Sequence, residues 1–206
     1  MKSTIFDLVI TSPTCVHKNP SDNVYVYEFT IPILPAFAIE YFTLQFGASS
    51  CFPDKQDSIQ NDKLTIFLGY SLDEVDSKLV IHYHGIRDYA LLFPFITDSS
   101  LKERLGDFYR EAEITFENAS WLSFILMCGA IFEGILFAKL EQNKSFHELI
   151  ITASQQGLID AYTKSIMNTV RGYRNLVHAK KYTDPYVSRM DSMDVRITLD
   201  KLIKAA

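Results

Sequence analysis

Twenty consecutive residues, WLSFILMCGAIFEGILFAKL at positions 121–140, constrain the fold of this chain more than any other stretch. An apolar run of this length either spans a bilayer, which takes about 20 residues, or forms a helix that other helices enclose. Glu133 lies inside the run, and a carboxylate at the middle of a membrane costs about 2.5 kcal/mol or more on insertion scales. We therefore expect the central helix of a bundle and no membrane partner, with a membrane span as the alternative.

The spacing of apolar residues along the sequence changes near residue 98. Residues 1–97 are rich in Tyr, Phe, Ile and Val, and several stretches alternate apolar and polar residues between polar turns. This two-residue period is typical of half-buried strands, so an antiparallel sandwich, open barrel or curved sheet is predicted. The predicted strands are 4–11, 23–34, 37–46, 63–71, 78–86 and 89–96, and the predicted turns are 19–23, 53–62 and 71–78.

Residues 98–206 have the apolar spacing of helices instead. Ser100 with Glu103 and Ser145 with Glu148 are spaced as capping boxes, and Asp160 is placed to cap the helix that follows it. The expected fold class is α+β, with an N-terminal antiparallel β domain (1–97) and a C-terminal bundle of four or five helices (98–206). The predicted helices are 98–118, 119–141, 143–157, 161–181 and 190–206.

Charge and cysteine content restrict the possible partners. The 25 acidic and 20 basic residues leave a net charge of −5, so any contact with nucleic acid needs a local basic patch. Cys15, Cys51 and Cys128 are odd in number and form no CxxC pair, which indicates neither a disulfide framework nor a zinc site. The first residues also lack the continuous apolar core of a secretion signal. We expect a reduced, cytoplasmic protein without a metal or cofactor.

A local basic patch does occur in VRGYRNLVHAKK, residues 170–181. Arg171, Arg174 and His178 are spaced i, i+3, i+7, which places them on one stripe of a helix. Arginine guanidinium groups hold phosphate oxygens, and a histidine acts as general acid or base near neutral pH. Lys180 and Lys181 extend the positive surface. Such a set could bind RNA and cleave it without a metal ion.

The same stripe also has a structural interpretation. Basic residues near a helix C-terminus complement the helix dipole, and a histidine beside leucine and valine is often the partner of a buried carboxylate. Glu133 is the candidate structural partner, because an acid within an apolar helix has to be paired or neutralised. The spacing alone leaves both interpretations open.

VRGYRNLVHAKK resembles the R-x-x-R-N-x-x-H signature of many HEPN-type helical domains, whose general motif is Arg, four to six residues, then His. The helices predicted before it resemble those of the same family, so the resemblance covers about residues 100–205. It implies an up-and-down bundle that forms a homodimer through the motif helix, here 160–181, with one composite cleft at the interface. Catalytic members are metal-independent endoribonucleases, many of them in antiviral defence or toxin–antitoxin systems. Other members are RNA-binding or interaction modules.

Carried onto this chain, the resemblance makes His178 the catalytic histidine and Arg171 the motif arginine, since six residues separate them. Asn175 matches the polar position of the motif. Arg174 lies too close to His178 for the motif and is assigned to phosphate binding or to structural support. The expected function is RNA cleavage or RNA binding, with the β domain choosing a partner protein or substrate. The alternative is a non-catalytic dimerisation or protein-interaction module.

Two weaker candidates lie in the first half. His82 and His84 are expected on the same face of a strand, where they could be half of a metal site. No nearby acid or cysteine completes such a site in the sequence, so a surface or interface pair is expected. The aromatic residues of 23–46 could stack on bases, but few basic residues accompany them, so a packed sheet face is expected.

Overall fold

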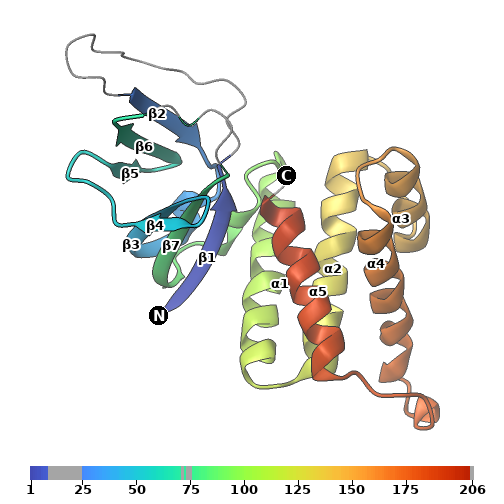
Figure 1. The fold of residues 1–206 in the computed structure, drawn as a ribbon. Coiled ribbons are helices and arrows are strands. Elements are labelled where there is room, and N and C mark those ends of the chain that lie inside the picture. The colour runs from blue at the N-terminus through green and yellow to red at the C-terminus, as the bar shows by residue number, and fades with distance from the viewer. Residues whose placement is uncertain (9–24, 71, 73–75, 205–206) are drawn as a thin grey trace. The chain divides into compact units, whose positions relative to one another are not determined.

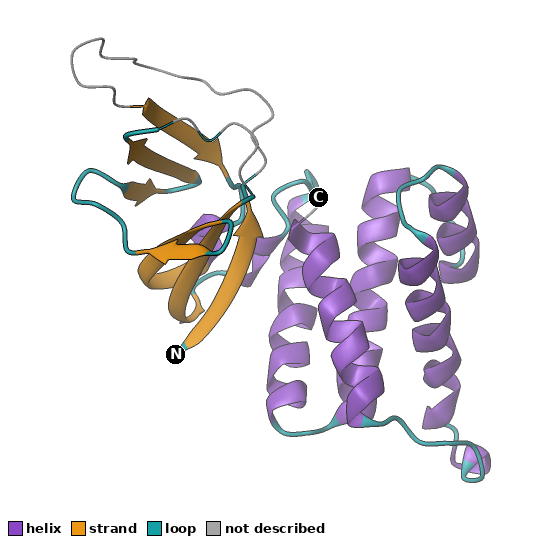
Figure 2. Cartoon of the chain, in the orientation of Figure 1, coloured by secondary structure: helices purple, strands orange, loops and turns teal. Residues whose placement is uncertain are grey.

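The computed structural model describes residues 1–8, 25–70, 72 and 76–204. The chain forms two compact units, Met1–Asp88 and Tyr89–Ala206, which we call the β unit and the helical unit. The strands belong to the first unit and the long helices to the second (Figures 1 and 2). The predicted α+β class is therefore confirmed. Cys15 and the predicted turn at 19–23 lie outside the described residues.

The β unit holds two antiparallel sheets. In both sheets every described pair of neighbouring strands is antiparallel. The first sheet has the order β1 (Lys2–Asp7), β7 (Ser77–Ile86), β3 (Phe37–Phe46) and β4 (Ser49–Cys51). The second has the order β2 (Tyr25–Thr30), β6 (Lys63–Leu68) and β5 (Ser58–Gln60).

The core of the β unit comes from the alternation of the strands. Leu64 and Ile66 in β6, and Leu79 and Ile81 in β7, are all 0% exposed, and each pair is two residues apart. Because side chains two apart lie on the same face of a strand, each strand contributes one apolar face to the core. Tyr27 is also buried, and its hydroxyl accepts a 2.9 Å hydrogen bond from the Leu72 amide. Tyr27 therefore lies in a packed sheet face, as the scarcity of basic residues suggested.

Two predictions in this half are wrong. Residues 89–96 form the 3-10 helix η2 (Tyr89–Leu92) and turns, and they belong to the helical unit. The periodicity of an apolar run this short cannot tell a strand from buried turns. In this run, Pro94 also interrupts the regular backbone. The predicted turn at 53–62 contains β5, and β4 was not predicted. β4 and β5 are each three residues long and contain no fully buried residue, so they carry almost no apolar alternation.

The helical unit contains five α-helices. The helix α2 contacts each of the other four, and nine of its residues are buried. It is the predicted central helix, and it is apolar nearly all round because its neighbours cover most sides. By length and composition it is also the one described helix apolar enough to cross a membrane. The five helices are α1 (Ser99–Glu117), α2 (Trp121–Leu140), α3 (Phe146–Gln155), α4 (Ala161–Tyr173) and α5 (Arg189–Lys204).

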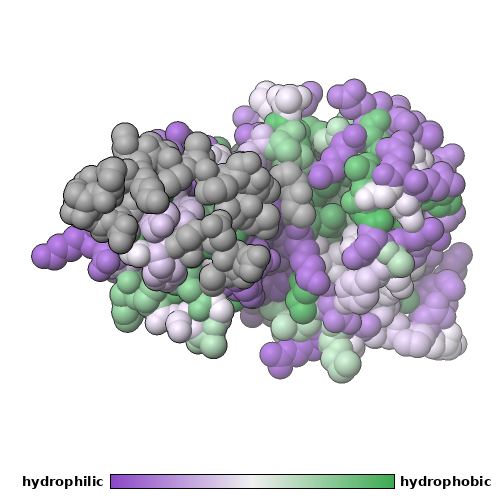
Figure 3. Space-filling view, turned by 45° about the horizontal axis from the view of Figure 1, so that its top comes forward, coloured by the Kyte–Doolittle hydropathy of each residue, from purple (hydrophilic) through white to green (hydrophobic). Residues whose placement is uncertain are grey.

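Hydrophilic and apolar residues are interspersed over the surface of the helical unit on the face that Figure 3 shows. Several large apolar side chains of α5 and of the segment before it are exposed, among them Tyr182, Tyr186 and Met190. Nine of the twenty residues of α2 are thus buried inside the unit, while the C-terminal segment keeps large apolar groups at the surface.

Short polar side chains set where the helices begin. The predicted cap of α3 is confirmed, since Ser145 and Glu148 form a reciprocal capping box. Asp160 also caps α4 as predicted, accepting a 2.7 Å bond from the Thr163 amide. The predicted box at Ser100 is wrong, because Asp98 caps α1 by accepting from the Leu101 amide. An aspartate two residues earlier therefore satisfies one of the free amides in the first turn of the helix.

One close approach inside the helical unit gives a testable prediction. A Cβ added at Gly106 in α1 would lie 2.8 Å from the Ala90 backbone nitrogen and 3.0 Å from the Tyr89 carbonyl carbon in η2. Backbone atoms cannot rotate away, so Gly106→Ala has to separate α1 from η2. We expect it to lower the free energy of unfolding by about 1–3 kcal/mol, the usual cost of overpacking.

Gly172→Ala is the matched control. A Cβ at this α4 position would meet nothing within 4 Å, so the change should raise stability by up to about 1 kcal/mol through helix propensity. Urea unfolding followed by circular dichroism at the helix band measures both variants. Equal effects of the two substitutions would contradict the assigned packing of η2 on α1.

Candidate functional site

The segment that carries the predicted site does not continue as one helix. α4 ends at Tyr173 rather than at 181, and the 3-10 helices η3 (Arg174–Val177) and η4 (Ala179–Lys181) follow it. His178 lies between them in an extended conformation, with φ −83° and ψ 114°. Gly172 and Asn175 are weak helix formers, and a helix end commonly tightens into 3-10 geometry. The prediction of a continuous helix over 161–181 is therefore wrong.

This early end separates the three members of the predicted stripe. Arg171 stays in the last turn of α4 and Arg174 begins η3, so both remain close to the end of that helix. His178 no longer follows them at helical spacing, because its extended backbone turns the chain. The His178 amide still donates to the Asn175 carbonyl oxygen at 3.2 Å, and its own carbonyl accepts from Lys181 at 2.8 Å.

Both arginines line a pocket of about 600 Å³ on the helical unit, which we call the α3–α4 pocket. The end of α4, the first residues of η3, the beginning of α3 and one position of α2 form it. Of the predicted site residues, Arg171, Arg174, Asn175 and Glu133 come together here, whereas His178, Lys180 and Lys181 do not line it. The lining residues are Glu133, Ser145, Phe146, His147, Arg171, Gly172, Arg174 and Asn175.

Glu133 pairs with Arg174. The Arg174 Nη1 atom donates to the Glu133 Oε2 atom at 3.2 Å, and the two side chains are 48% and 37% exposed. Glu133 is thus a half-buried acid within α2 with an arginine partner, and it has no contact with His178 among the described interactions. An ion pair this exposed adds at most about 1 kcal/mol to stability, so its main effect is to offset one positive charge of the pocket.

Arg171 provides the charge that is not offset. Its side chain is exposed and makes no hydrogen bond or ion pair with any residue that the structure describes. Its guanidinium therefore keeps its donors available at the pocket. Lys181 is paired with Asp184 at 3.0 Å, and Lys180 is exposed on η4. Arg171 thus lines the pocket with a positive charge that no described residue offsets.

The beginning of α3 adds a histidine that the sequence reasoning missed. His147 follows the cap residue Ser145 and the buried Phe146, and it lines the same pocket as Arg171. Its only sequence signal was its place just inside a predicted helix start, about two dozen residues before the motif. Only the packing of α3 against α4 brings it to the pocket, as the contacts between these helices show.

The capping box fixes this helix start at neutral pH. The Ser145 amide and hydroxyl donate to the Glu148 Oε2 atom at 3.0 and 2.6 Å. These bonds hold the pKa of the Glu148 carboxyl below its usual value, so it stays ionised through the neutral range. The stability that the box contributes is therefore present at neutral pH and decreases only as acid protonates Glu148. Phe146 and His147 are held at the pocket under those conditions.

The pocket has the composition of an anion site. Arg171, Arg174 and His147 surround it, and the positive end of the α3 dipole points toward its rim, while Glu133 opposes one of these charges.

Among the described residues, no group of three His, Cys, Asp or Glu side chains could hold a metal ion. His82 stacks on Tyr41 at 4.3 Å, and His84 contacts Glu40 at 2.7 Å.

No family model, curated protein or solved structure matches the chain.

Proposed function

We propose that the helical unit binds RNA through its backbone phosphates at the α3–α4 pocket, and that a pair of chains cleaves the bound RNA without a metal ion. The observation that carries the proposal is Arg171, an exposed guanidinium without a partner among the described residues, at a pocket that Arg174 and His147 also line. On a chain with a net charge of −5, this is a local basic site rather than a general basic surface.

The choice of RNA rests on the motif as well as on the pocket. Arg171, Asn175 and His178 match the arginine, polar residue and histidine of the HEPN motif that this segment resembles. Arg171 and Asn175 line the pocket, and His178 follows them on the exposed segment between η3 and η4. In such domains two copies of the segment form one cleft, so His178 would complete the site in a homodimer.

The proposed reaction balances without a cofactor. A histidine takes the proton of the ribose 2′-hydroxyl, whose oxygen attacks the adjacent phosphorus. The bond from phosphorus to the 5′-oxygen breaks, and an acid returns a proton to that oxygen. The products are a 2′,3′-cyclic phosphate and a free 5′-hydroxyl. Arg171 and Arg174 stabilise the negative charge that develops on the phosphate oxygens, and His178 carries the proton.

RNA binding tests the proposal before any cleavage is considered. A fluorescein-labelled single-stranded RNA in excess chelator should bind the wild-type chain, and fluorescence polarisation measures its affinity. Arg171→Gln should weaken binding by about 10-fold or more, since a charge-assisted contact contributes about 1.5–3 kcal/mol. Glu133→Gln should strengthen binding, because it removes the negative charge that offsets Arg174.

Arg110→Gln is the matched control for charge. Arg110 is exposed on α1 in the same unit and pairs with Asp107 at 3.0 Å, away from the pocket lining. It removes one positive charge, as Arg171→Gln does, and should leave the affinity within about 2-fold. Equal losses in both variants would contradict a specific site and leave only general attraction between charges.

A non-catalytic interaction module is the second candidate function. Its support is the exposed apolar surface of the motif segment and of the residues just after it, where Val177 is 54%, Tyr182 87% and Tyr186 68% exposed. Apolar groups of this size at the surface are typical of protein contacts. The internal Arg174–Glu133 pair agrees with a structural role for that arginine. A stable pair of chains that binds no RNA would support this second function over the first.

A further inference from the structure

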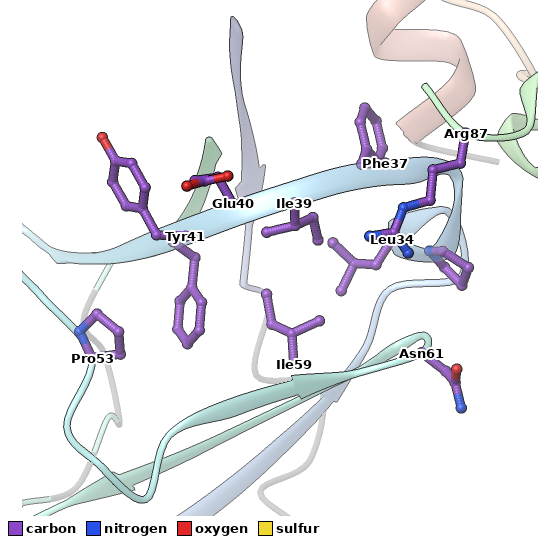
Figure 4. Close-up of a pocket in the computed structure, with 11 residues that line it drawn as sticks. Leu34, Phe37, Ile39, Glu40, Tyr41, Pro53, Ile59, Asn61 and Arg87 are labelled. Carbon is purple, nitrogen blue, oxygen red and sulfur yellow. The ribbon is translucent and has the colours of Figure 1, made fainter. Parts of the chain in front are cut away.

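The β unit has a second pocket, of about 590 Å³, between its two sheets. We call it the β3–β5 cleft, because β3 of the first sheet and β5 of the second form its two sides. Leu34 and Ile39 point into it from one side and Ile59 from the other (Figure 4). A volume of this size is typical of ligand sites in proteins. The complete lining is Leu34, Pro35, Phe37, Ile39, Glu40, Tyr41, Phe42, Pro53, Ile59, Asn61 and Arg87.

Within the described residues, both strands beside the cleft have an edge without a partner strand. β4 pairs only with Leu44–Phe46, so the first part of β3, residues 37–43, has no strand on that side within the described chain. β5 pairs only with β6, and its other edge is likewise unpaired in the part of the chain that the structure describes. Such edges present backbone N–H and C=O groups that can accept a further strand.

One end of the cleft is positively charged. Arg87 follows β7, and its amide donates to the Ala36 carbonyl oxygen at 2.7 Å, which fixes the backbone beside the start of β3. The Arg87 side chain extends from there beside Leu34 (Figure 4). Its guanidinium has no hydrogen bond or ion pair with any described residue. At the far end, Glu40 already contacts His84.

We propose that the β3–β5 cleft binds the C-terminal end of an extended peptide, with the terminal carboxylate on Arg87. The peptide adds a strand along the free edge of β3, and its carboxylate offers the bidentate acceptor that a guanidinium favours. Because Arg87 lies beside the start of β3, the peptide runs antiparallel to that strand. This inference does not depend on the proposed RNA site.

The strand geometry also predicts the peptide sequence. Alternate side chains of a strand point to opposite faces, so the last and third-last residues of the peptide lie on the same face. That face meets Ile39 and Ile59 in the cleft, which requires apolar residues at both positions. A long-chain carboxylate such as decanoate has the same head group and apolar body, but it cannot form the backbone hydrogen bonds of a strand.

The test uses the full chain and fluorescein-labelled hexapeptides with Val, Ile, Leu or Phe at the last and third-last positions, measured by fluorescence polarisation. We expect members of this set to bind, and binding to weaken by about 10-fold or more when the terminal carboxylate is amidated or when Arg87 is changed to Gln. Methylation of the peptide backbone nitrogens that face β3 should weaken it similarly. Lys63→Gln, which removes an exposed charge outside the cleft lining, should leave it unchanged.

Three results would overturn the inference. The first is that no peptide of the set binds at about 1 mM, the weak end of measurable affinity. The second is that hexapeptides with a free terminal carboxylate and hexapeptides with an amidated terminus bind equally, which removes the role of Arg87. The third is that decanoate binds in an Arg87-dependent way while the peptides do not, which would make the cleft a site for a small apolar acid. A melting curve of the Arg87→Gln variant, compared with that of the wild type, shows whether the variant is folded.

Discussion

Phe132→Ala is expected to lower the free energy of unfolding of the helical unit by about 3–5 kcal/mol, the usual cost of removing a buried phenylalanine ring. Phe132 lies in the middle of α2 and is 0% exposed. α2 contacts the other four helices, so they cannot all move inward to fill the space that the ring leaves. Total stabilities of domains are about 5–15 kcal/mol, so this loss is a large part of what holds the bundle together.

Phe137→Ala is the control on the same helix. Phe137 is 42% exposed, so its truncation leaves little cavity and should cost less than about 1 kcal/mol. Both variants are measured by urea unfolding at the helix band of the circular dichroism spectrum. Similar costs at the two positions would show that α2 is not enclosed as described. A small cost at both would contradict its role as the core helix.

His178→Ala is expected to reduce RNA cleavage by about 10²–10⁴-fold, the range that a general acid or base contributes. The assay uses a long single-stranded RNA in excess chelator and detects 2′,3′-cyclic phosphate ends on the products. His178 is exposed, and its side chain has no partner within the described chain, so its removal should not change the melting temperature. A loss of cleavage at an unchanged melting temperature therefore indicates a chemical role of His178 rather than a structural one.

His84→Ala controls for the loss of an exposed histidine. His84 lies on β7 and contacts Glu40, outside the α3–α4 pocket, so its removal should leave cleavage unchanged. Cleavage that persists in His178→Ala at equal stability would contradict the assigned role of this histidine. Wild-type protein that binds RNA in an Arg171-dependent way but leaves it intact would limit the function to binding. Absence of both activities would favour the interaction module.

The site was only partly predictable, for a reason visible in its residues. Arg171, Arg174 and His178 are close together in sequence, so their spacing identified them as candidates, and the resemblance of the segment to HEPN domains implied their roles. Their arrangement could not be predicted, because it depends on where α4 ends, and His178 leaves the stripe at that point. His147 could not be predicted either, since it joins Arg171 only through the packing of α3 on α4.

In the β half, the long strands could be predicted from the sequence and the short ones could not. β3 and β7 carry ten residues each, and their apolar positions predicted them nearly residue by residue. β4 and β5 have three residues each, and their conformation is fixed by ladder bonds to β3 and β6 rather than by their own composition. The β3–β5 cleft follows from this pairing, because β4 covers only the end of β3.

The sequence by itself determined the α+β class, the central position of α2 and the starts of α3 and α4, because periodicity and capping act between residues close together in the chain. The tertiary structure alone decided that Arg174 pairs with Glu133, that Arg171 has no partner among the described residues, and that Arg87 lines the β3–β5 cleft. These outcomes depend on distances between separate elements. A charged side chain is neutralised or available according to what the fold places beside it, and its own neighbours in sequence do not specify that.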